Sequence, residues 1–529
     1  MNIPTLPAAL NAAIASHPGR EALIYRDRTW TYSELGELVE RIASACRARQ
    51  IGPGTVVAMQ LQSTPQFVAS LFGAWRAGCI VVPINPMYRY GELAHVLTDS
   101  GATVVITDRG TYTDGMQQAA AECGVRWTFL TDDDDLASPR TEEQNPPRVV
   151  SDLLTDLPPD TGRVEWTIDP DAPALLSYTS GTSGPPKGAI NTHANLAWSA
   201  TRLVEHLRLE PAARVYAMAP LFHITGMVCE IGGCITLAGT LMVPGRFSPH
   251  VALQEFLQFE PHWTVGPSTA YIALLNAPGA SPQHFASFQS ASCGGAPLPP
   301  KVVDEFQRRF SLYLLNGYGL TETAAGCVSV QPEEPAPVDE SSGTLSIGKV
   351  IAGTSLRVLD EFGQQLRAGE LGELAISSPA VTPGYWNNPC ATAAATRDGY
   401  FLTGDVGFVD QHGWVYLVDR KKDMIVSSGF KVWPREVEDV IYRLPGVREV
   451  AVVGVDDSYR GEAVAAYVSA SAGHLVDPDA VKAHCRAHLA AYKCPRDVHV
   501  LDDLPKTVSG KILRRAFRSD ESSANPSNP

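Results

Sequence analysis

The stretch of the sequence best suited to chemistry is residues 177–188, where five Ser/Thr hydroxyls, three glycines and one lysine stand together. Small side chains of this kind cannot pack a core, but the open backbone N–H groups around them can surround a polyphosphate. A surface linker is the alternative, although linkers seldom place a single lysine after two prolines between a strand and a helix. The composition predicts a phosphate-binding loop made by Thr179, Ser180, Gly181, Thr182, Ser183, Gly184 and Lys187.

This loop differs from the P-loop of ordinary NTPases, which requires a hydroxyl residue directly after its lysine. Here Gly188 follows Lys187. The apolar residues 174–176 predict a buried strand and the chain from Asn195 onward predicts a helix, so we expect the order strand, loop, helix. The loop resembles the phosphate loop of the adenylate-forming superfamily, which includes acyl- and aryl-CoA synthetases, firefly luciferase and the adenylation domains of peptide synthetases.

Six further segments resemble that superfamily in the same order, so the resemblance covers about residues 21–515. The first is 220–226. The resemblance implies that this segment borders an acyl pocket and that His223 lies beside the reacting carboxylate, whereas a satisfied core histidine is the alternative. Peptide-synthetase adenylation domains carry an aspartate near this point. This sequence has no acidic residue there, which argues against an amino-acid substrate.

The second and fourth segments are expected to hold the nucleoside. The glycines of 292–297 would let the backbone approach a flat ring closely. The resemblance makes Gly295, Ala296 and Pro297 the adenine-binding turn, with a plain turn as the alternative. The fourth segment ends in Asp405, whose carboxylate follows a glycine and, by resemblance, accepts both ribose hydroxyls.

The third segment supplies an aromatic ring, a hydroxyl and a carboxylate within a few residues. By resemblance, Tyr318, which stands between Gly317 and Gly319 in the sequence, packs on adenine. The resemblance also implies that Thr321 contacts the α-phosphate and Glu322 binds Mg²⁺. A carboxylate oxygen is a ligand that this hard cation prefers. A simple β-turn would also suit two glycines around a tyrosine, but Thr-Glu-Thr after it makes that the weaker interpretation.

The last two segments concern the C-terminal part of the chain. By resemblance, Arg420 also touches the ribose, Lys422 is the hinge of a domain rotation, and the loop containing Ser428 and Gly429 lines a pantetheine tunnel. An ordinary charged linker is the alternative. The sixth segment ends at Lys511, which in the superfamily enters the active site and stabilises developing negative charge, although most loop lysines are merely solvated.

The elements that must position these residues fall into three patterns. Strands alternate with helices over 31–107 and 215–265, which predicts an α/β fold with two doubly wound sheets. Short strands with Gly/Asp turns predict an antiparallel β subdomain over 343–418. A small, mobile α+β unit follows the charged junction. We expect a large N-terminal domain (1–419), a hinge (420–422), a small C-terminal domain (423–518) and a disordered tail (519–529).

The totals restrict the partners. A chain of 529 residues implies two or more domains, and a net charge of −15 argues against nucleic acid. The ten cysteines show no Cys-x-x-Cys pair and no clustering with histidine, so we expect reduced thiols and a cytoplasmic location. No apolar run reaches the length of a membrane span. The apolar stretch 6–15 lacks the basic flank of a signal peptide and predicts an amphipathic helix.

The resemblance implies an acyl-CoA ligase that uses ATP, Mg²⁺ and coenzyme A, with Lys511, Thr182, Lys187, Glu322 and His223 as the catalytic residues and Glu322 as the metal ligand. Apolar and aromatic residues in the expected pocket favour a hydrophobic fatty, aryl or alicyclic acid. An acyl-AMP ligase that loads a carrier protein is the main alternative, and luciferase chemistry is a weaker one. A catalytically dead binding module is a further alternative, but Lys187, Glu322, Asp405 and Lys511 are all present. The sequence leaves the oligomeric state open, and a homodimer, the commonest assembly, is the default.

Overall fold

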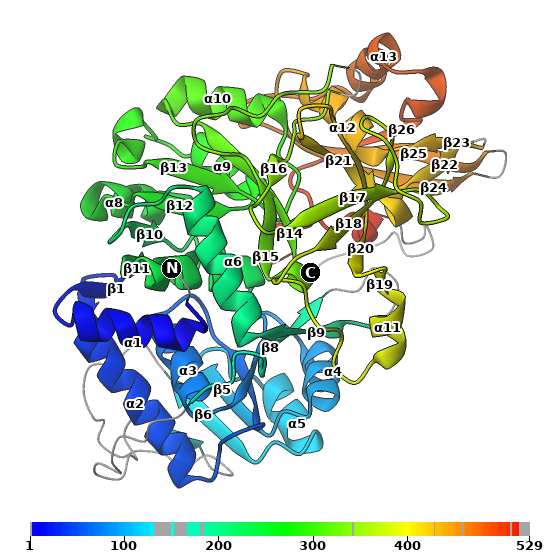
Figure 1. The fold of residues 1–529 in the computed structure, drawn as a ribbon. Coiled ribbons are helices and arrows are strands. Elements are labelled where there is room, and N and C mark those ends of the chain that lie inside the picture. The colour runs from blue at the N-terminus through cyan, green and yellow to red at the C-terminus, as the bar shows by residue number, and fades with distance from the viewer. Residues whose placement is uncertain are drawn as a thin grey trace.

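The structure is a computed structural model that describes residues 3–131, 150–152, 167–179, 185–340, 343–427, 429–457, 460–507 and 510–517. Figure 1 shows a large N-terminal body of two sheets and their helices, joined by an antiparallel β layer to a smaller unit in orange and red. We call residues 423–517 the C-terminal unit, residues 355–420 the antiparallel layer, and the residues before 355 the N-terminal body. Among the described residues, no helix is long and apolar enough to cross a membrane.

The first sheet of the N-terminal body has seven strands in the order β7-β6-β5-β3-β4-β8-β9. All neighbours are parallel except β8 and β9, which form an antiparallel pair at one edge. The strands are β3 (Val56–Gln60), β4 (Ile80–Pro83), β5 (Val104–Asp108), β6 (Trp127–Thr131), β7 (Val150–Asp152), β8 (Pro173–Thr179) and β9 (Lys187–Thr192). The helices between them are α3 (Pro65–Arg76), α4 (Tyr90–Ser100) and α5 (Asp114–Glu122).

The second sheet has nine strands in the order β16-β15-β14-β13-β12-β10-β11-β1-β2. Its strands are β1 (Glu21–Tyr25), β2 (Arg28–Thr31), β10 (Arg214–Tyr216), β11 (Thr240–Met242), β12 (Trp263–Gly266), β13 (Ser290–Cys293), β14 (Leu314–Leu320), β15 (Ala325–Ser329) and β16 (Lys349–Val350). Its helices are α1 (Leu6–Ser16), α2 (Tyr32–Ala48), α6 (His193–His206), a π-helix (Gly226–Gly232) that continues into α7 (Gly233–Thr236), α8 (Pro249–Phe259), α9 (Ser268–Leu275) and α10 (Pro300–Phe310). One hydrophobic core contains residues of both sheets, so the two are packed as a single body.

The antiparallel layer carries two of the expected ligand residues. It consists of β17 (Ser355–Leu359), β18 (Gly372–Ser377), β19 (Thr396–Arg397), β20 (Tyr400–Val409) and β21 (Val415–Arg420), with α11 (Pro389–Ala394) before β19. Strands β20 and β21 pair so that Asp405 lies opposite Arg420. The hairpin of β20 and β21 therefore brings Asp405 and Arg420 side by side.

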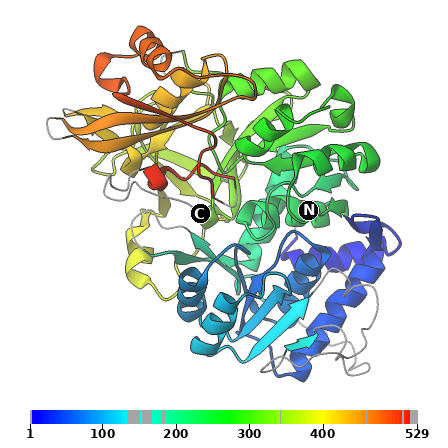
Figure 2. The same ribbon diagram turned by 180° about the vertical axis from the view of Figure 1, so that it is seen from behind.

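The C-terminal unit has its own core of apolar residues between a sheet and two helices. It contains β22 (Ile425–Ser427), β23 (Phe430–Val432), α12 (Pro434–Tyr442), β24 (Val447–Asp457), β25 (Gly461–Ala470), α13 (Pro478–His488) and β26 (Asp497–Leu501). Figure 2 shows the red final segment, 510–517, lying between this unit and the N-terminal body. The ring of Phe517 stacks on Tyr467 of β25 at 4.1 Å between centroids, which anchors the segment to the C-terminal unit.

The expected α/β fold with its β layer and α+β unit is confirmed. A capping box of Thr31 and Glu34 begins α2. One expectation was wrong. Strand β9 follows the phosphate loop, and helix α6 begins only after it, at His193. The edge strand β9 holds its place by pairing with β8, a contact that its own weakly apolar sequence does not signal. The expected tail, 519–529, lies outside the described residues.

Candidate active site

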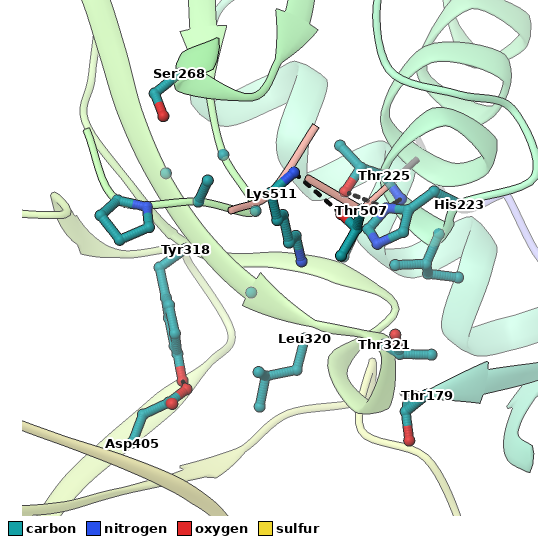
Figure 3. Close-up of a pocket in the computed structure, with 18 of the residues that line it drawn as sticks. Thr179, His223, Thr225, Ser268, Tyr318, Leu320, Thr321, Asp405, Thr507 and Lys511 are labelled. Atoms are coloured by element: carbon teal, nitrogen blue, oxygen red, sulfur yellow. Dashed lines mark hydrogen bonds between the residues drawn. The ribbon is translucent and has the colours of Figure 1, made fainter. Parts of the chain in front are cut away.

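A cavity of about 1430 Å³ lies where the N-terminal body, the antiparallel layer and the C-terminal unit meet. Its walls include the carboxyl ends of parallel strands β8 and β12, the place where ligands bind in open α/β sheets. Figure 3 shows Lys511 pointing into this cavity, with the Tyr318 and Asp405 pair on one side and His223 on the other. Residues from every expected segment except the loop after Ser427 therefore line one space.

Asp405 is a buried carboxylate held by two partners. Its Oδ2 accepts a hydrogen bond from the Tyr318 hydroxyl at 2.6 Å, and its Oδ1 lies 3.2 Å from Nε of Arg420. Burial raises the pKa of Asp405, and the Arg420 charge opposes that rise. A carboxylate has about four lone-pair positions. Two partners therefore leave Asp405 able to accept further hydrogen bonds from a ligand.

Lys511 reaches the cavity from the C-terminal unit. Its backbone N–H donates to Oγ1 of Thr507 at 3.0 Å, and a Cβ added to Gly295 would lie 3.3 Å from its Cε. Burial, and to a smaller extent the charge of Arg420, lower the pKa of Lys511 to about 8, while Asp405 and Glu322 oppose the shift. The side chain is therefore a cation at neutral pH, but a more acidic one than an exposed lysine.

His223 is a neutral imidazole in this site. Burial lowers its pKa to about 3, with a smaller contribution from the charge of Lys511. The backbone N–H of Thr225 donates to its Nδ1 at 3.3 Å, and the Thr225 hydroxyl lies 3.1 Å from the same atom. Because Nδ1 accepts, the ring proton is on Nε2. His223 can therefore donate one hydrogen bond into the cavity.

Glu322 and Lys187 meet at one aromatic ring. The Tyr385 hydroxyl donates to Oε1 of Glu322 at 2.9 Å, and Nζ of Lys187 lies 5.4 Å from the centroid of the same ring. Among the described residues there is no group of three or more His, Cys, Asp or Glu side chains that could hold a metal ion alone. Glu322 offers a single carboxylate, the type of side chain that can share a Mg²⁺ ion with substrate phosphates.

The two expected nucleoside turns lie side by side. A Cβ on Gly294 would be 3.5 Å from the carbonyl oxygen of Gly317, so the adenine turn and the start of the Tyr318 segment are in contact. Gly295 has φ of +76°, a backbone conformation that favours glycine. Gly319 is fixed by packing, because a Cβ there would come 1.6 Å from the carbonyl oxygen of Ala325.

The other expected site residues divide among the cavity, the exposed surface and the part of the chain that is not described. Thr179, Ala296, Pro297, Thr321 and Lys422 line the cavity, Lys422 with an exposed side chain. Gly429 is exposed in the turn between β22 and β23 and does not line the cavity. Six expected site residues lie outside the described residues. They are Ser180, Gly181, Thr182, Ser183 and Gly184 of the phosphate loop and Ser428 of the expected pantetheine loop.

The structure adds four residues that the sequence interpretation missed. Tyr385 bonds Glu322, and Thr269 bonds the backbone before Lys511. Glu230 is a fully buried carboxyl beside the pocket wall, and Arg514 bridges three carboxylates. The sequence offered a local signal for Arg514, because this residue stands only three positions after the expected site residue Lys511. The other three have no local signal, because each acts on residues 11 or more positions away in the chain.

Two family models match the chain: "AMP-binding enzyme" over residues 10–386 and "AMP-binding enzyme C-terminal domain" over residues 436–511. A feruloyl-CoA synthase of Amycolatopsis is 35% identical over 503 residues, covering 95% of this chain and 96% of that protein. A long-chain-fatty-acid–CoA ligase of Bacillus subtilis is 31% identical and covers 98% of this chain and 94% of that protein.

Solved structures agree with this assignment. An ATP-bound MatB from Rhodopseudomonas palustris superposes with a TM-score of 0.85 at 27% identity, covering 97% of this chain and 98% of that one. A benzoate CoA ligase from Burkholderia xenovorans superposes with a TM-score of 0.86 at 25% identity, covering 97% and 100%. The chain belongs to the AMP-binding enzyme family, and so to the adenylate-forming superfamily that includes the acyl-CoA synthetases. The resemblance stated from the sequence is thereby confirmed.

Proposed function

We propose that the protein is an ATP-dependent acyl-CoA ligase that works in two steps. First, a carboxylate oxygen of the acid attacks the α-phosphorus of ATP, and pyrophosphate leaves as the acyl-adenylate forms. Second, the sulfur of coenzyme A attacks the acyl carbonyl, the thiol proton passes to solvent, and AMP leaves with the electrons of the broken C–O bond. The observation that supports this best is the position of Lys511 in the cavity between His223 and Asp405 (Figure 3).

In the first step, Lys511 and His223 act on the reacting oxygens. The ammonium of Lys511 stabilises the negative charge that builds on the carboxylate and phosphate oxygens, which is an electrostatic role. The Nε2–H of neutral His223 donates to a carboxylate oxygen and orients it. No protein nucleophile is required, because the mixed anhydride is itself the activated form of the acid.

The nucleotide is bound by the remaining residues of the cavity. Adenine lies between Tyr318 and the turn of Gly295, the ribose hydroxyls bond Asp405 and Arg420, and Thr321 contacts the α-phosphate. Thr182 and the rest of the phosphate loop, with Lys187, would hold the β- and γ-phosphates, and Glu322 would hold Mg²⁺. When bound, the ion neutralises charge on the phosphates.

The acid is a hydrophobic fatty or aryl carboxylic acid. Apolar side chains line the cavity, among them Leu203, Phe222, Trp263, Val265 and Ile272. Feruloyl-CoA synthase and long-chain-fatty-acid–CoA ligase, two similar proteins, are named for acids of this kind. Coenzyme A, and not a carrier protein, is the acceptor.

The C-terminal unit is a mobile domain that turns about a hinge at 420–422. In the orientation described, Lys511 is inside the cavity and Gly429 is outside it, as the first step requires. The second step brings Ser428 and Gly429 to the tunnel for coenzyme A. We place the enzyme in the cytoplasm, where its ten free thiols stay reduced, and expect a homodimer, which light scattering on a size-exclusion column would test.

A screen of fatty, aryl and alicyclic acids for pyrophosphate release tests the proposal. Release should require ATP and one class of acid, and thioester should form only when coenzyme A is added. Thioester on a carrier protein but not on coenzyme A would contradict the acceptor. No release with any acid would contradict the ligase itself.

Glu322→Gln tests the metal assignment, because it removes a charge while keeping the shape of the side chain. Adenylation should fall strongly and need more Mg²⁺. Wild-type rates across a Mg²⁺ titration would show that the ion is held elsewhere.

A further inference from the structure

Thr269 joins the N-terminal body to the loop that carries Lys511. It lies in the first turn of α9, beside the cavity. Its hydroxyl donates to the carbonyl oxygen of Gly510 at 2.8 Å, a bond that spans 241 positions of sequence. The acceptor belongs to the residue directly before Lys511. A bond at this carbonyl therefore fixes the peptide from which the Lys511 side chain extends.

The fit around Gly510 is close. A Cβ on this residue would lie 2.7 Å from Oγ1 of Thr269 and 3.1 Å from the ring of Pro267, and its φ is +80°. Only glycine meets both conditions without strain. The loop is therefore shaped to pass against the start of α9, with Lys511 continuing toward Gly295.

The two partners of this bond belong to different bodies. The segment after Lys511 is attached elsewhere. Arg514 forms ion pairs with Asp419 and Glu438, and Phe517 stacks on the C-terminal unit itself. Thr269 belongs to the N-terminal body. If the C-terminal unit turns, the loop moves with it and the bond to Thr269 breaks. The stacking contact of Phe517 is kept, because both of its rings belong to the C-terminal unit.

We propose that Thr269 is a positioning residue for the adenylation step. It holds the Gly510 peptide so that the Lys511 ammonium reaches the reacting oxygens, and it has no part in the transfer to coenzyme A. The inference rests on the proposed two-step function. A single neutral hydrogen bond suits this role, because it orients the lysine yet breaks readily when the unit turns.

Thr269→Val tests the proposal, since valine keeps the shape and removes the hydroxyl. Adenylation measured by pyrophosphate release should fall about three- to tenfold, the range that one such bond is worth. Thioester formation from supplied acyl-adenylate should be unchanged. Thr269→Ser, which keeps the hydroxyl, should restore adenylation. Both steps are measured on one preparation, so their ratio does not depend on the folded fraction.

Thr236→Val is the matched control. Its hydroxyl also donates to a carbonyl at 2.8 Å, that of Gly232, but within one helix of the N-terminal body. It should leave the ratio of the two steps at the wild-type value. Equal loss of both steps in Thr269→Val, or failure of serine to restore the first, would overturn the proposal. The wild-type enzyme run alongside separates that result from failure of the ligase function itself, which would abolish pyrophosphate release in every variant.

Discussion

At the scale of single residues, burial sets the charge states on which the proposed chemistry depends. Burial favours the neutral form of any base, and it lowers the pKa of both Lys511 and His223. Because lysine begins far above histidine, the same effect leaves Lys511 charged and His223 neutral near pH 7. The site therefore offers one cation and one neutral donor to the reacting oxygens.

The first prediction concerns the pH dependence of adenylation. Lys511 acts as a cation and its pKa is lowered to about 8, so kcat/KM for pyrophosphate release should fall as pH rises through about 8. Lys511→Arg, if it adenylates, should move that fall to higher pH, because arginine stays protonated. A wild-type profile that stays flat to about pH 9.5 would contradict the charge assigned to Lys511.

The second prediction concerns Glu230, which is fully buried in the π-helix. Its Oε1 accepts the backbone N–H of Ala219 at 3.1 Å, and burial raises its pKa well above the usual 4.5. The folded protein thus binds this proton more tightly than the unfolded chain does. Its contribution to stability is present at low pH and is lost as pH rises above 4.5, at up to about 1.4 kcal/mol per pH unit.

Glu230→Gln should therefore raise the melting temperature at pH 7–8 and change it little near pH 4. Differential scanning fluorimetry across this range would measure the effect. Glu205→Gln, at an exposed position on α6, is the control and should leave the pH dependence unchanged. A loss of stability in Glu230→Gln that grows as pH rises from 4 to 8 would show instead that the buried carboxylate is ionised and paired.

At the scale of elements, Arg514 connects the Lys511 segment to a strand and a helix. Its guanidinium lies 3.0 Å from Asp419 of β21 and 2.7 Å from Glu438 of α12. Both carboxylates are buried, and burial raises the pKa of Glu438 while the Arg514 charge opposes the rise. The Lys511 segment is thus held by ionic contacts to both the antiparallel layer and the C-terminal unit.

Arg514→Leu should destabilise the protein by about 3–5 kcal/mol, because it leaves two buried carboxylates without their cation. Adenylation should also fall, since the segment that places Lys511 is released. Urea unfolding followed by circular dichroism would measure the first effect. Arg486→Leu, at an exposed position on α13, should be nearly neutral. Equal midpoints for the two variants would contradict the structural role of Arg514.

At the scale of the whole molecule, the proposed two-step function makes the orientation of the C-terminal unit decide which step can occur. The described orientation of the C-terminal unit places Lys511 in the cavity. Besides the bond of Thr269, a second contact stabilises this orientation: Nζ of Lys301 on α10 donates to the carbonyl oxygen of Leu444 at 3.1 Å. Gly429 is on the exposed side of the unit. The second step requires a different orientation, reached through a few backbone angles at the proposed hinge.

Lys422→Pro should separate the two steps. Proline fixes φ near −65° and removes an N–H, so the hinge should keep one orientation and lose the other. A burst of acyl-adenylate should persist while thioester production collapses. Single-turnover measurements of both products would test this, with Lys511→Ala as the opposite case, losing about 10²–10³-fold in adenylation only. If both steps slow together in Lys422→Pro, or neither changes, the hinge lies elsewhere.

The sequence by itself determined the family, the phosphate chemistry and most of the element order. These depend on short-range patterns: the hydroxyl and glycine composition of 177–188, the capping box at Thr31, and the alternation of strands with helices. Each is a property of a few neighbouring residues. Such patterns can be recognised in the sequence because they do not depend on residues distant in the chain.

Tertiary structure alone decided the arrangement of the site. Strand β9 exists because it pairs with β8, and Thr269 meets Gly510 across 241 positions. The lowered pKa of Lys511 and the raised pKa of Glu230 come from burial by residues distant in the chain. Contacts and desolvation of this kind depend on which surfaces the folded elements present to each other, and no local pattern of residue types encodes that.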